Sequence, residues 1–291
     1  MNNLIPCSPF TKNTPFDTKA AYWWGRLWET ALTFLKWENL PDVDELYLNA
    51  TLLSKGYIIG CKRRGKIWML DGAYYDIDAY FEPTRGTIAN PILGTFKGVF
   101  GKDMVLGFAN VMHISIIPLI TEFSKQLAAI DTDIQVELDN AKATKIFRVN
   151  GSEEAAKVKR FLDDIHVGKP AILDNSEVSL FDDIDKKIFT SPSEYNVTQM
   201  LKDRRTIIND FLTKLGINNT AVEKDERVNL IEATMNDQEI LINREFWLKS
   251  LRKFCTEFNA MFGTSVSVSI IGDESGVGIE GNESEVDSDD M

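Results

Sequence analysis

The chain has 291 residues, of which 44% are hydrophobic and 26% are charged, and its formal net charge is −12. This length and composition allow one large or two small domains with buried cores, and they exclude a chain that is disordered throughout. The acidic balance also excludes a protein that grips nucleic acid with a global basic surface, because affinity for phosphate comes mainly from Lys and Arg.

The longest apolar run, near residues 114–120, is far shorter than the roughly 18 residues that a bilayer-spanning helix needs. Residues 1–10 lack the basic and apolar regions of a signal peptide. The three cysteines, Cys7, Cys61 and Cys255, are widely spaced, which fits a reducing cytoplasm better than a disulfide framework. We therefore expect synthesis in the cytoplasm of a cell and no membrane partner.

The first predicted helix begins at Asp17, which can cap it, and ends near Asn39, just before Pro41. Residues 1–16 precede it as a flexible arm. The apolar stripe of the helix contains three tryptophans: Trp23, Trp24 and Trp28. We interpret them as core or as subunit interface, since a platform on which bases stack would need interleaved cations, and only Arg26 is present.

Short apolar runs separated by Gly, Pro and Asn predict a β-rich section over residues 42–113. A short helical or irregular link over 42–50 opens this section. Strands are expected within 56–70, near 74–81, at 95–99 and at 104–108. Together they favour a small antiparallel barrel or sheet.

A basic turn joins the two strands expected within 56–70. Its sequence is Lys62-Arg63-Arg64-Gly65-Lys66, the densest positive cluster in the chain. We interpret this turn as a solvated hairpin tip.

Apolar residues at steps of three and four predict a second long helix over 114–142, with Pro118 tolerated because it falls in the first turn. This helix is too long to bury its stripe against one small domain, so we expect a partner helix in this chain or in a neighbouring copy. Residues 143–190 then predict a compact α/β insert. Its elements are a strand at 145–149, a helix at 152–163 and a strand at 171–173.

The best-marked helix is predicted over residues 191–216. Ser191 can cap it, Pro192 takes the first helical position, and Gly216 stands where a left-handed terminator belongs. Its apolar residues recur at three- and four-residue steps, which indicates one buried face. The helix carries four cations: Lys202, Arg204, Arg205 and Lys214.

Residues 217–239 are polar and acidic, and their composition predicts a mobile loop. The charged residues of this loop are Glu223, Lys224, Asp225, Glu226, Arg227, Glu232, Asp237 and Glu239. Residues 240–271 then predict an amphipathic helix over 245–262, stopped by Gly263, and a closing strand over 266–270.

The acidic tail, residues 272–291, carries eight carboxylates and no Lys or Arg, and we predict that it is disordered. Its acids are Asp273, Glu274, Glu280, Glu283, Glu285, Asp287, Asp289 and Asp290. Without these eight charges the net charge changes from −12 to −4.

Residues that would mark an enzyme or a cofactor site are missing. Residues 276–281 match the dinucleotide motif G-x-G-x-x-G only formally, because they lie among acids and not between a strand and a helix. His113 and His166 stand far apart, without the cysteine neighbours of a zinc site. The acidic pairs at 163–164 and 182–183 could hold metal ions in a nuclease. We expect no cofactor, no metal and no catalytic residue, and therefore a structural or assembly component.

Four short stretches of the chain carry a resemblance to a known family. They are FLKWENLP at 34–41, FLTKLGINN at 211–219, EKDERV at 223–228 with NDQEI at 236–240, and LKSLR at 248–252. The first contains the W-E-N-L-P signature of the upper collar, or portal (head-tail connector), proteins of small podophages of the Picovirinae type. The resemblance covers roughly residues 23–270.

The resemblance implies an α+β portal fold, assembled as a ring of twelve copies around a DNA channel at one vertex of the capsid. It divides the chain into an arm (1–16), tilted stem helices (17–41, 114–142 and the channel-lining 191–216), a small α/β clip (143–190), a tunnel loop (217–239), a β-rich wing (42–113 and 240–271) and the acidic tail (272–291). Such a ring passes double-stranded DNA during packaging, retains it, ejects it and joins head to tail. The implied partners are a packaging ATPase, the major capsid and scaffolding proteins, and the lower collar and tail proteins. The implied location is the virion.

For the DNA channel, the resemblance makes candidates of Lys202, Arg204, Arg205 and Lys214, and of the acids and bases of the tunnel loop. Pairs between subunits are the alternative role for these charges, and both roles stay open. The family's lysine rings do not transfer, because Gln199 and Thr190 stand near those positions. Residues 1–16 contain only Lys12, so no contact of the arm with motor RNA is expected.

Two alternatives belong to other classes of function. A metal-dependent nuclease would use the aspartate pairs and would lose activity in Asp182→Ala. A monomeric assembly adaptor would sediment with the mass of one chain.

Overall fold

The computed structural model of the chain describes residues 6–11, 14–142, 156, 197–218 and 230–272. It divides into two compact units. The first contains Met1–Pro9, Ala21–Ser124 and Ile208–Met291, and the second contains Phe10–Ala20 and Lys125–Ile207.

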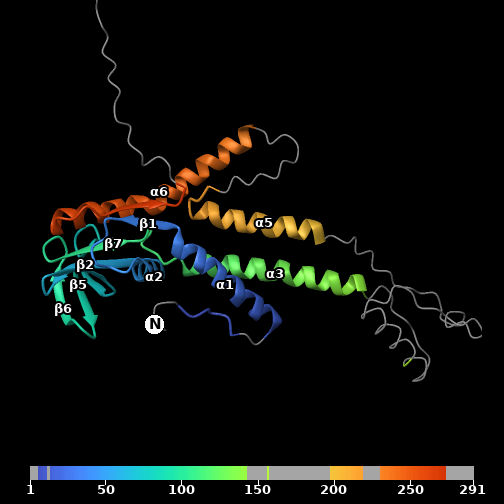
Figure 1. The fold of residues 1–291 in the computed structure, drawn as a ribbon, viewed down its shortest axis with the longest axis horizontal. Coiled ribbons are helices and arrows are strands. Elements are labelled where there is room, and N and C mark those ends of the chain that lie inside the picture. Colours follow the sequence, from blue (N-terminus) through green and yellow to red (C-terminus); the bar gives the residue numbers. More distant parts are fainter. Residues whose placement is uncertain (1–5, 12–13, 143–155, 157–196, 219–229, 273–291) are drawn as a thin grey trace, which may run out of the picture. The chain divides into compact units, whose positions relative to one another are not determined.

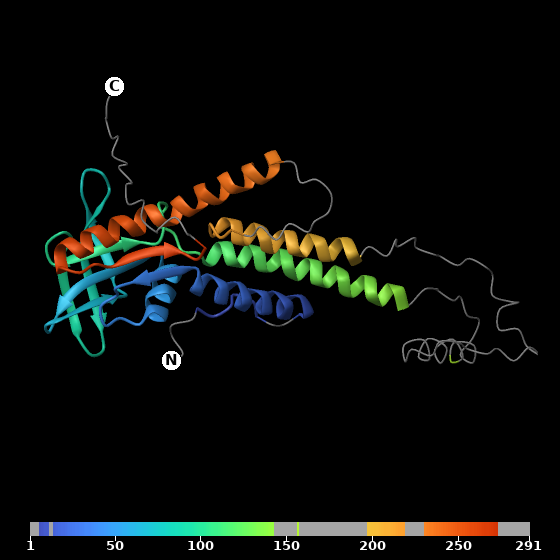
Figure 2. The ribbon, with the colours of Figure 1, turned by 45° about the horizontal axis from the view of Figure 1, so that its top comes forward.

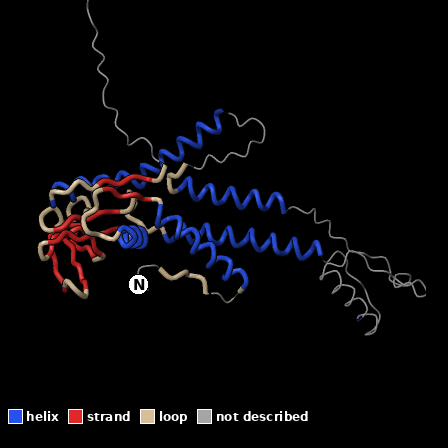
Figure 3. Tube along the Cα trace, viewed as in Figure 1, coloured by secondary structure: helices blue, strands red, loops and turns tan. Residues whose placement is uncertain are grey.

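Helices and strands are both abundant, as the α+β prediction requires (Figure 1). In chain order they are α1 (Pro15–Thr33), β1 (Leu35–Glu38), α2 (Glu45–Lys55), β2 (Tyr57–Arg63), β3 (Lys66–Leu70), β4 (Ala73–Ile77), β5 (Pro83–Asn90), β6 (Gly94–Val99), β7 (Met104–Phe108), α3 (Ile117–Lys142), α5 (Val197–Lys214), α6 (Leu230–Phe262) and β8 (Ser267–Ile270). All of these strands belong to the first unit (Figure 3). Helices α1, α3 and α5 contribute residues to both units.

Helix α1 begins slightly earlier than predicted. The backbone N–H of Asp17 donates to Thr14 Oγ1 at 3.0 Å, and the Thr14 hydroxyl donates to the Asp17 carboxylate at 2.9 Å. Thr14 is therefore the N-cap, whose side-chain oxygen accepts from the N–H of the third helical residue, Asp17. Pro15 takes the first helical position, where its missing N–H costs nothing.

The C-terminal end of the predicted helix over 17–41 is wrong. Leu35–Glu38 form β1, which pairs antiparallel with β8, with Leu35 opposite Ile270 and Glu38 opposite Ser267. Burial alternates along β1 in the two-residue period of a strand. The partner strand lies near the other end of the chain, so the pairing that decides this segment is not visible in local sequence.

The tryptophans of α1 lie mainly in the core, as predicted. Trp24 and Trp28 are 3% and 2% exposed, and their rings stack with centroids 5.8 Å apart. Trp37 on β1 donates from Nε1 to Asn49 Oδ1 at 2.8 Å, and Asn49 Nδ2 donates to the carbonyl of Leu32 at 3.0 Å. The buried amide of Asn49 therefore ties α2 to the turn between α1 and β1.

The β-rich section contains two three-stranded antiparallel sheets, with strand orders β3-β2-β7 and β4-β5-β6. The hairpin predicted within 56–70 is confirmed: β2 and β3 are joined by Arg64 and Gly65, whose φ angles are +49° and +79°. Strand β5 was not predicted, because Pro83 and Gly86 interrupt its apolar pattern. The other predicted strands are found close to their expected positions.

The sheet β3-β2-β7 is covered on both faces. On one face, residues of β2, β3 and β7 form a core with residues of β5 and the β5–β6 loop: Ile59, Cys61, Leu70, Ile88, Leu93 and Met104. On the other face, α6 lies along the strands (Figure 2). Glycines on that face bring α6 very close, since a Cβ at Gly60 would lie 2.6 Å from the Phe258 ring and one at Gly107 would lie 2.5 Å from the Phe254 ring.

Helix α6 is longer than predicted. The predicted loop over 217–239 is helical from Leu230 onward, and the helix continues unbroken to Phe262, where Gly263 ends it with a φ of +67°. Residues 217–262 contain no Gly or Pro, and Glu, Ala, Met and Gln between them are good helix formers. Acidic composition therefore misled the prediction for this part. Residues 219–229 lie outside the described residues.

Helices α3 and α5 lie within their predicted ranges where they are described, although α3 begins at Ile117 and not at residue 114. Helix α3 contains Pro118 as its second residue, and α5 ends at Lys214, two residues before Gly216. The predicted start of α5 at 191–196 and almost all of the clip over 143–190 lie outside the described residues.

All three cysteines are free, and burial raises the pKa of Cys61 to about 11 and that of Cys255 to about 12. None of the described helices is both long and apolar enough to cross a membrane.

The close approach of α6 to the strands yields a test. Gly107→Ala places a methyl group in the space of the Phe254 ring, so we expect the free energy of unfolding to fall by roughly 1–3 kcal/mol. Urea unfolding followed by circular dichroism, at one fixed protein concentration, measures this change. Gly25→Ala on α1 is the control, because no atom lies within 4 Å of its added Cβ and an exchange of Gly for Ala inside a helix stabilises by up to about 1 kcal/mol. Equal effects of the two substitutions would contradict the packing argument.

Candidate functional site

The four cations predicted to line the channel have different surroundings. Arg204 on α5 is paired with Asp131 on α3, with 3.0 Å between Nη1 and Oδ1. These side chains are only 34% and 21% exposed, so the pair is screened less than a surface pair. The backbone carbonyl of Asp131 also accepts from Lys19 Nζ at 2.8 Å. Residues of three helices of the second unit therefore meet at Asp131.

Lys214 lies in the first unit and is paired within the chain as well. Its Nζ lies 2.7 Å from Glu239 Oε1, and both side chains are about half exposed. The hydrogen bond from Lys214 holds the pKa of Glu239 below its usual range. Glu239 was predicted in the tunnel loop, but it is a residue of α6. The pair thus joins the end of α5 to α6.

Lys202 and Arg205 are exposed on α5. Their side chains reach solvent, whereas Arg204 and Lys214 each pair with an acid of another helix. A contact of any of the four cations with a ligand stays a prediction.

The tunnel-loop candidates lie mostly outside the described residues. This applies to Glu223, Lys224, Asp225, Glu226 and Arg227. Glu232 and Asp237 are helical residues of α6, and Asp237 is exposed.

The C-terminal end of α5 has the geometry of a Schellman motif. The N–H of Ile217 donates to the carbonyl of Leu212 at 3.0 Å, and the N–H of Gly216 donates to that of Thr213 at 2.9 Å. Gly216 has a φ of +76°, in the left-handed region that such a motif requires. The terminator predicted from the sequence is therefore confirmed.

Side chains of α6 also donate to carbonyl groups at this helix end. Asn243 Nδ2 donates to the carbonyl of Thr213 at 3.0 Å, and Trp247 Nε1 donates to that of Lys214 at 3.0 Å. Arg244 Nε donates to the carbonyl of Gly216 at 3.2 Å. The last carbonyl groups of a helix have no partner within the helix, so these contacts fix the end of α5. The local sequence around 211–217 does not predict these contacts with α6.

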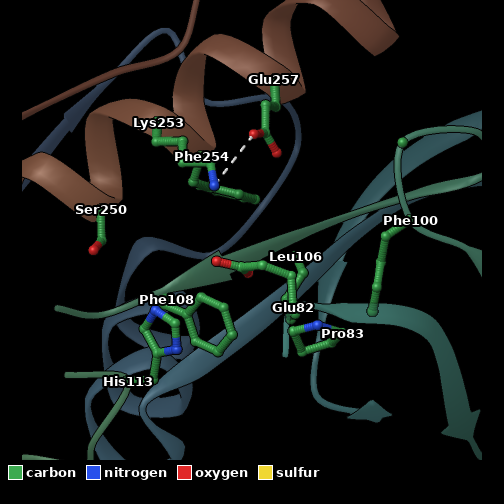
Figure 4. A pocket seen from close by; sticks show the side chains of 11 residues that line it. Glu82, Pro83, Phe100, Leu106, Phe108, His113, Ser250, Lys253, Phe254 and Glu257 are labelled. Atoms are coloured by element: carbon green, nitrogen blue, oxygen red, sulfur yellow. Dashed lines mark ion pairs between the residues drawn. The ribbon is translucent and has the colours of Figure 1, made fainter. Parts of the chain in front are cut away.

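A cavity of about 210 Å³ lies between α6 and the β-rich section (Figure 4). Ser250 and Lys253 reach it from α6, and Glu82 from the opposite wall. The ring of His113 stacks on that of Phe108, with centroids 3.5 Å apart, and burial lowers the pKa of His113 against an opposing effect of Glu82. Within the described part of the chain, Ser250 and His113 share no hydrogen bond.

Among the described residues, no three His, Cys, Asp or Glu side chains gather closely enough to hold a metal ion. The aspartate pairs at 163–164 and 182–183, which a nuclease would use, lie outside the described residues.

The fold is similar to that of a chain in a phage portal and tail. Over 88% of its length the chain is similar to a chain in the portal and tail of native bacteriophage P68, at 20% identity, with 87% of that chain covered and a TM-score of 0.53. It is less similar to a chain of the native gene transfer agent virion (14% identity, 91% of this chain and 82% of that one, TM-score 0.38). A chain from the neck of an empty gene transfer agent particle gives 15% identity, coverage of 92% and 83%, and a TM-score of 0.38.

The chain belongs to the Phage Connector (GP10) family, whose model matches residues 98–273. It is therefore a phage head-tail connector protein of the portal type, a component of the virion. The matched range runs from β6 through α3, α5 and α6 to the end of β8, so it includes both the channel candidates and the α5 terminus.

The end of α5 yields a second test. A Cβ at Gly216 would lie 2.8 Å from the Cα of Arg244, and the φ of +76° is strained for any other residue. We expect Gly216→Ala to lower the free energy of unfolding by roughly 2–4 kcal/mol. Alanine is strained in the left-handed conformation, and its methyl group would clash with Arg244. Gly263→Ala is the matched control, since its φ is +67° but no atom lies within 4 Å of its added Cβ. It should cost only about 1–2 kcal/mol. An equal loss in both variants, measured by urea unfolding, would show that the contact with Arg244 is unimportant.

Proposed function

We propose that the chain assembles into a ring of twelve copies at one capsid vertex, and that double-stranded DNA passes through the bore during packaging and ejection. The ring also retains the packaged DNA and joins the head to the tail. Membership of the connector family supports this proposal, as does the portal fold. The protein acts without catalysis: a packaging ATPase supplies the energy, and capsid, scaffolding, lower collar and tail proteins bind the outside of the ring.

The observation that carries ring assembly is the apolar surface on the helices. Large apolar side chains that are more than one third exposed occur on each long helix. They are Tyr22 (60%), Val136 (50%), Leu201 (38%), Leu241 (56%) and Ile242 (70%). In a closed ring every copy covers its neighbour, so contacts between copies would bury these side chains.

The DNA contact is proposed for the exposed cations Lys202 and Arg205 of α5. A bore through which DNA slides must avoid strong attachment, so only weak and separated cations suit it. Lys202 and Arg205 are chosen for their exposure, whereas Arg204 pairs with the partly buried Asp131 and Lys214 pairs with Glu239. The exposed Asp237 on α6, with the acids of residues 217–239, would add repulsion of phosphate.

Ring formation can be tested at the two adjacent exposed residues of α6. We expect the double variant Leu241→Asp and Ile242→Asp to assemble at least tenfold less, because charge replaces apolar contact between copies. Mass photometry and negative-stain microscopy measure the loss of annular particles, and circular dichroism shows whether each chain stays folded. Ile92→Asp, at a residue that is 78% exposed on the β5–β6 loop, is the control and should leave assembly unchanged. If the unaltered protein had the mass of a single chain, this result would refute the ring and favour a monomeric adaptor.

DNA passage can be tested in phage that carry charge reversals on α5. We expect Lys202→Glu with Arg205→Glu to leave rings intact but to reduce the nuclease-protected DNA per particle several-fold, since repulsion replaces weak attraction. The control is Lys249→Glu, at an exposed cation of α6 in the same chain. Equal amounts of protected DNA in both variants would show that Lys202 and Arg205 do not contact the DNA.

A further inference from the structure

The hairpin between β2 and β3 is a concentrated positive surface in an acidic protein. Its four cations, Lys62, Arg63, Arg64 and Lys66, are all exposed. Lys66 Nζ lies 3.4 Å from Asp42 Oδ2, in a pair whose side chains are 65% and 91% exposed. No carboxylate among the described residues pairs with Lys62 or Arg64. We refer to residues 62–66 as the basic hairpin.

The basic hairpin is held in a fixed conformation. Arg64 and Gly65 both have positive φ angles, +49° and +79°, as a type I′ turn requires. Asn or Gly is the usual residue where Arg64 stands, so the arginine is retained there at a conformational cost. Trp68 Nε1 donates to the carbonyl of Arg63 at 3.2 Å, and the Arg63 guanidinium lies 5.0 Å from the centre of the Phe96 ring. The turn backbone and the Arg63 side chain are therefore held in place, which lowers the entropy lost on binding an anion.

The chain itself supplies a complementary polyanion. The acidic tail holds eight carboxylates without a Lys or Arg, and the described part of the chain ends at Gly272, two residues after β8. The tail and the basic hairpin thus have opposite charge and belong to one polypeptide. Because the tail is tethered, its local concentration at the hairpin does not depend on the protein concentration.

The tail is long enough to reach the hairpin. Both lie close to the segment that follows β1, since Asn39 Nδ2 donates to the carbonyl of Ser265 at 3.2 Å and Lys66 pairs with Asp42. From Gly272 back along β8 to Ser265 is about 25 Å of extended chain, and from Asn39 to Asp42 is about 10 Å more. Residues 273–291 can span about 60 Å when extended.

We propose that the acidic tail of this chain binds the basic hairpin. The ligand class is a polycarboxylate, held by several exposed charge pairs that are each weak and together sensitive to salt. A bound tail would cover the strongest positive surface of the protein and keep it from DNA phosphates. This inference does not rest on the proposed passage of DNA through a ring.

The first experiment uses the full-length protein and a carbodiimide, which links an ammonium directly to a carboxylate that it touches. We expect mass spectrometry to find the tail carboxylates joined to Lys62 or Lys66, and at least fivefold fewer of these links when the salt is raised to about 0.5 M. The charge reversals Lys62→Glu and Arg64→Glu should remove the links to Lys66 as well. Lys102→Glu, at an exposed cation of another turn in the β-rich section, is the control and should leave them unchanged.

A second experiment separates the tail from DNA as the occupant. We expect a variant that stops after Gly272 to bind a short double-stranded DNA at least fivefold more tightly than the full chain does, and Lys62→Glu with Arg64→Glu to abolish the gain. Two results would overturn the proposal. One is a tail that cross-links equally to lysines all over the protein. The other is a hairpin that binds DNA equally well with and without the tail, which would make DNA its occupant.

Discussion

The close approach of α6 to the strands β2 and β7 is the constraint on which the first unit depends. Phe254 and Phe258 occupy the space that a Cβ would take at Gly107 and Gly60, so neither the helix nor the sheet can shift without a clash. Further toward its N-terminus, the same helix offers Asn243, Arg244 and Trp247 to the carbonyl groups at the end of α5. One rigid element therefore fixes both the sheet and the α5 terminus.

Two of the candidate cations on α5 are also held by contacts within the chain. Arg204 and Lys214 are placed on a helix that the family resemblance assigns to a DNA channel, yet each is bound to an acid of the same chain. The Arg204 pair is partly buried, and removing one partner would leave a charge that water reaches poorly. The Lys214 pair is exposed and weak by itself, but it adds to three hydrogen bonds at one helix end. These cations are therefore structural in the isolated chain, which neither of the two roles inferred from the sequence anticipated.

The sequence correctly predicted some helix ends and turns, because these features depend on neighbouring residues. Gly216 and Gly263 end α5 and α6 in the left-handed conformation that other residues avoid, and the basic turn falls between two paired strands. The errors have a different origin. The segment Leu35–Glu38 continues an apolar helical pattern, but it forms a strand because it pairs with β8. The start of α6 was predicted as a loop because its composition is acidic. For the site, the sequence could name Arg204 and Lys214 as candidates, but their partners Asp131 and Glu239 are decided by tertiary packing.

In the proposed ring, the exposed cations of α5 give the bore a particular character. A contact between phosphate and an exposed Lys or Arg is worth about 1 kcal/mol or less and is screened within roughly 10 Å at moderate salt. Each contact is thus comparable with thermal energy, and DNA can leave one cation for the next without a large barrier. A partly buried pair such as Arg204 and Asp131 could not serve in this way, because DNA would first have to break it.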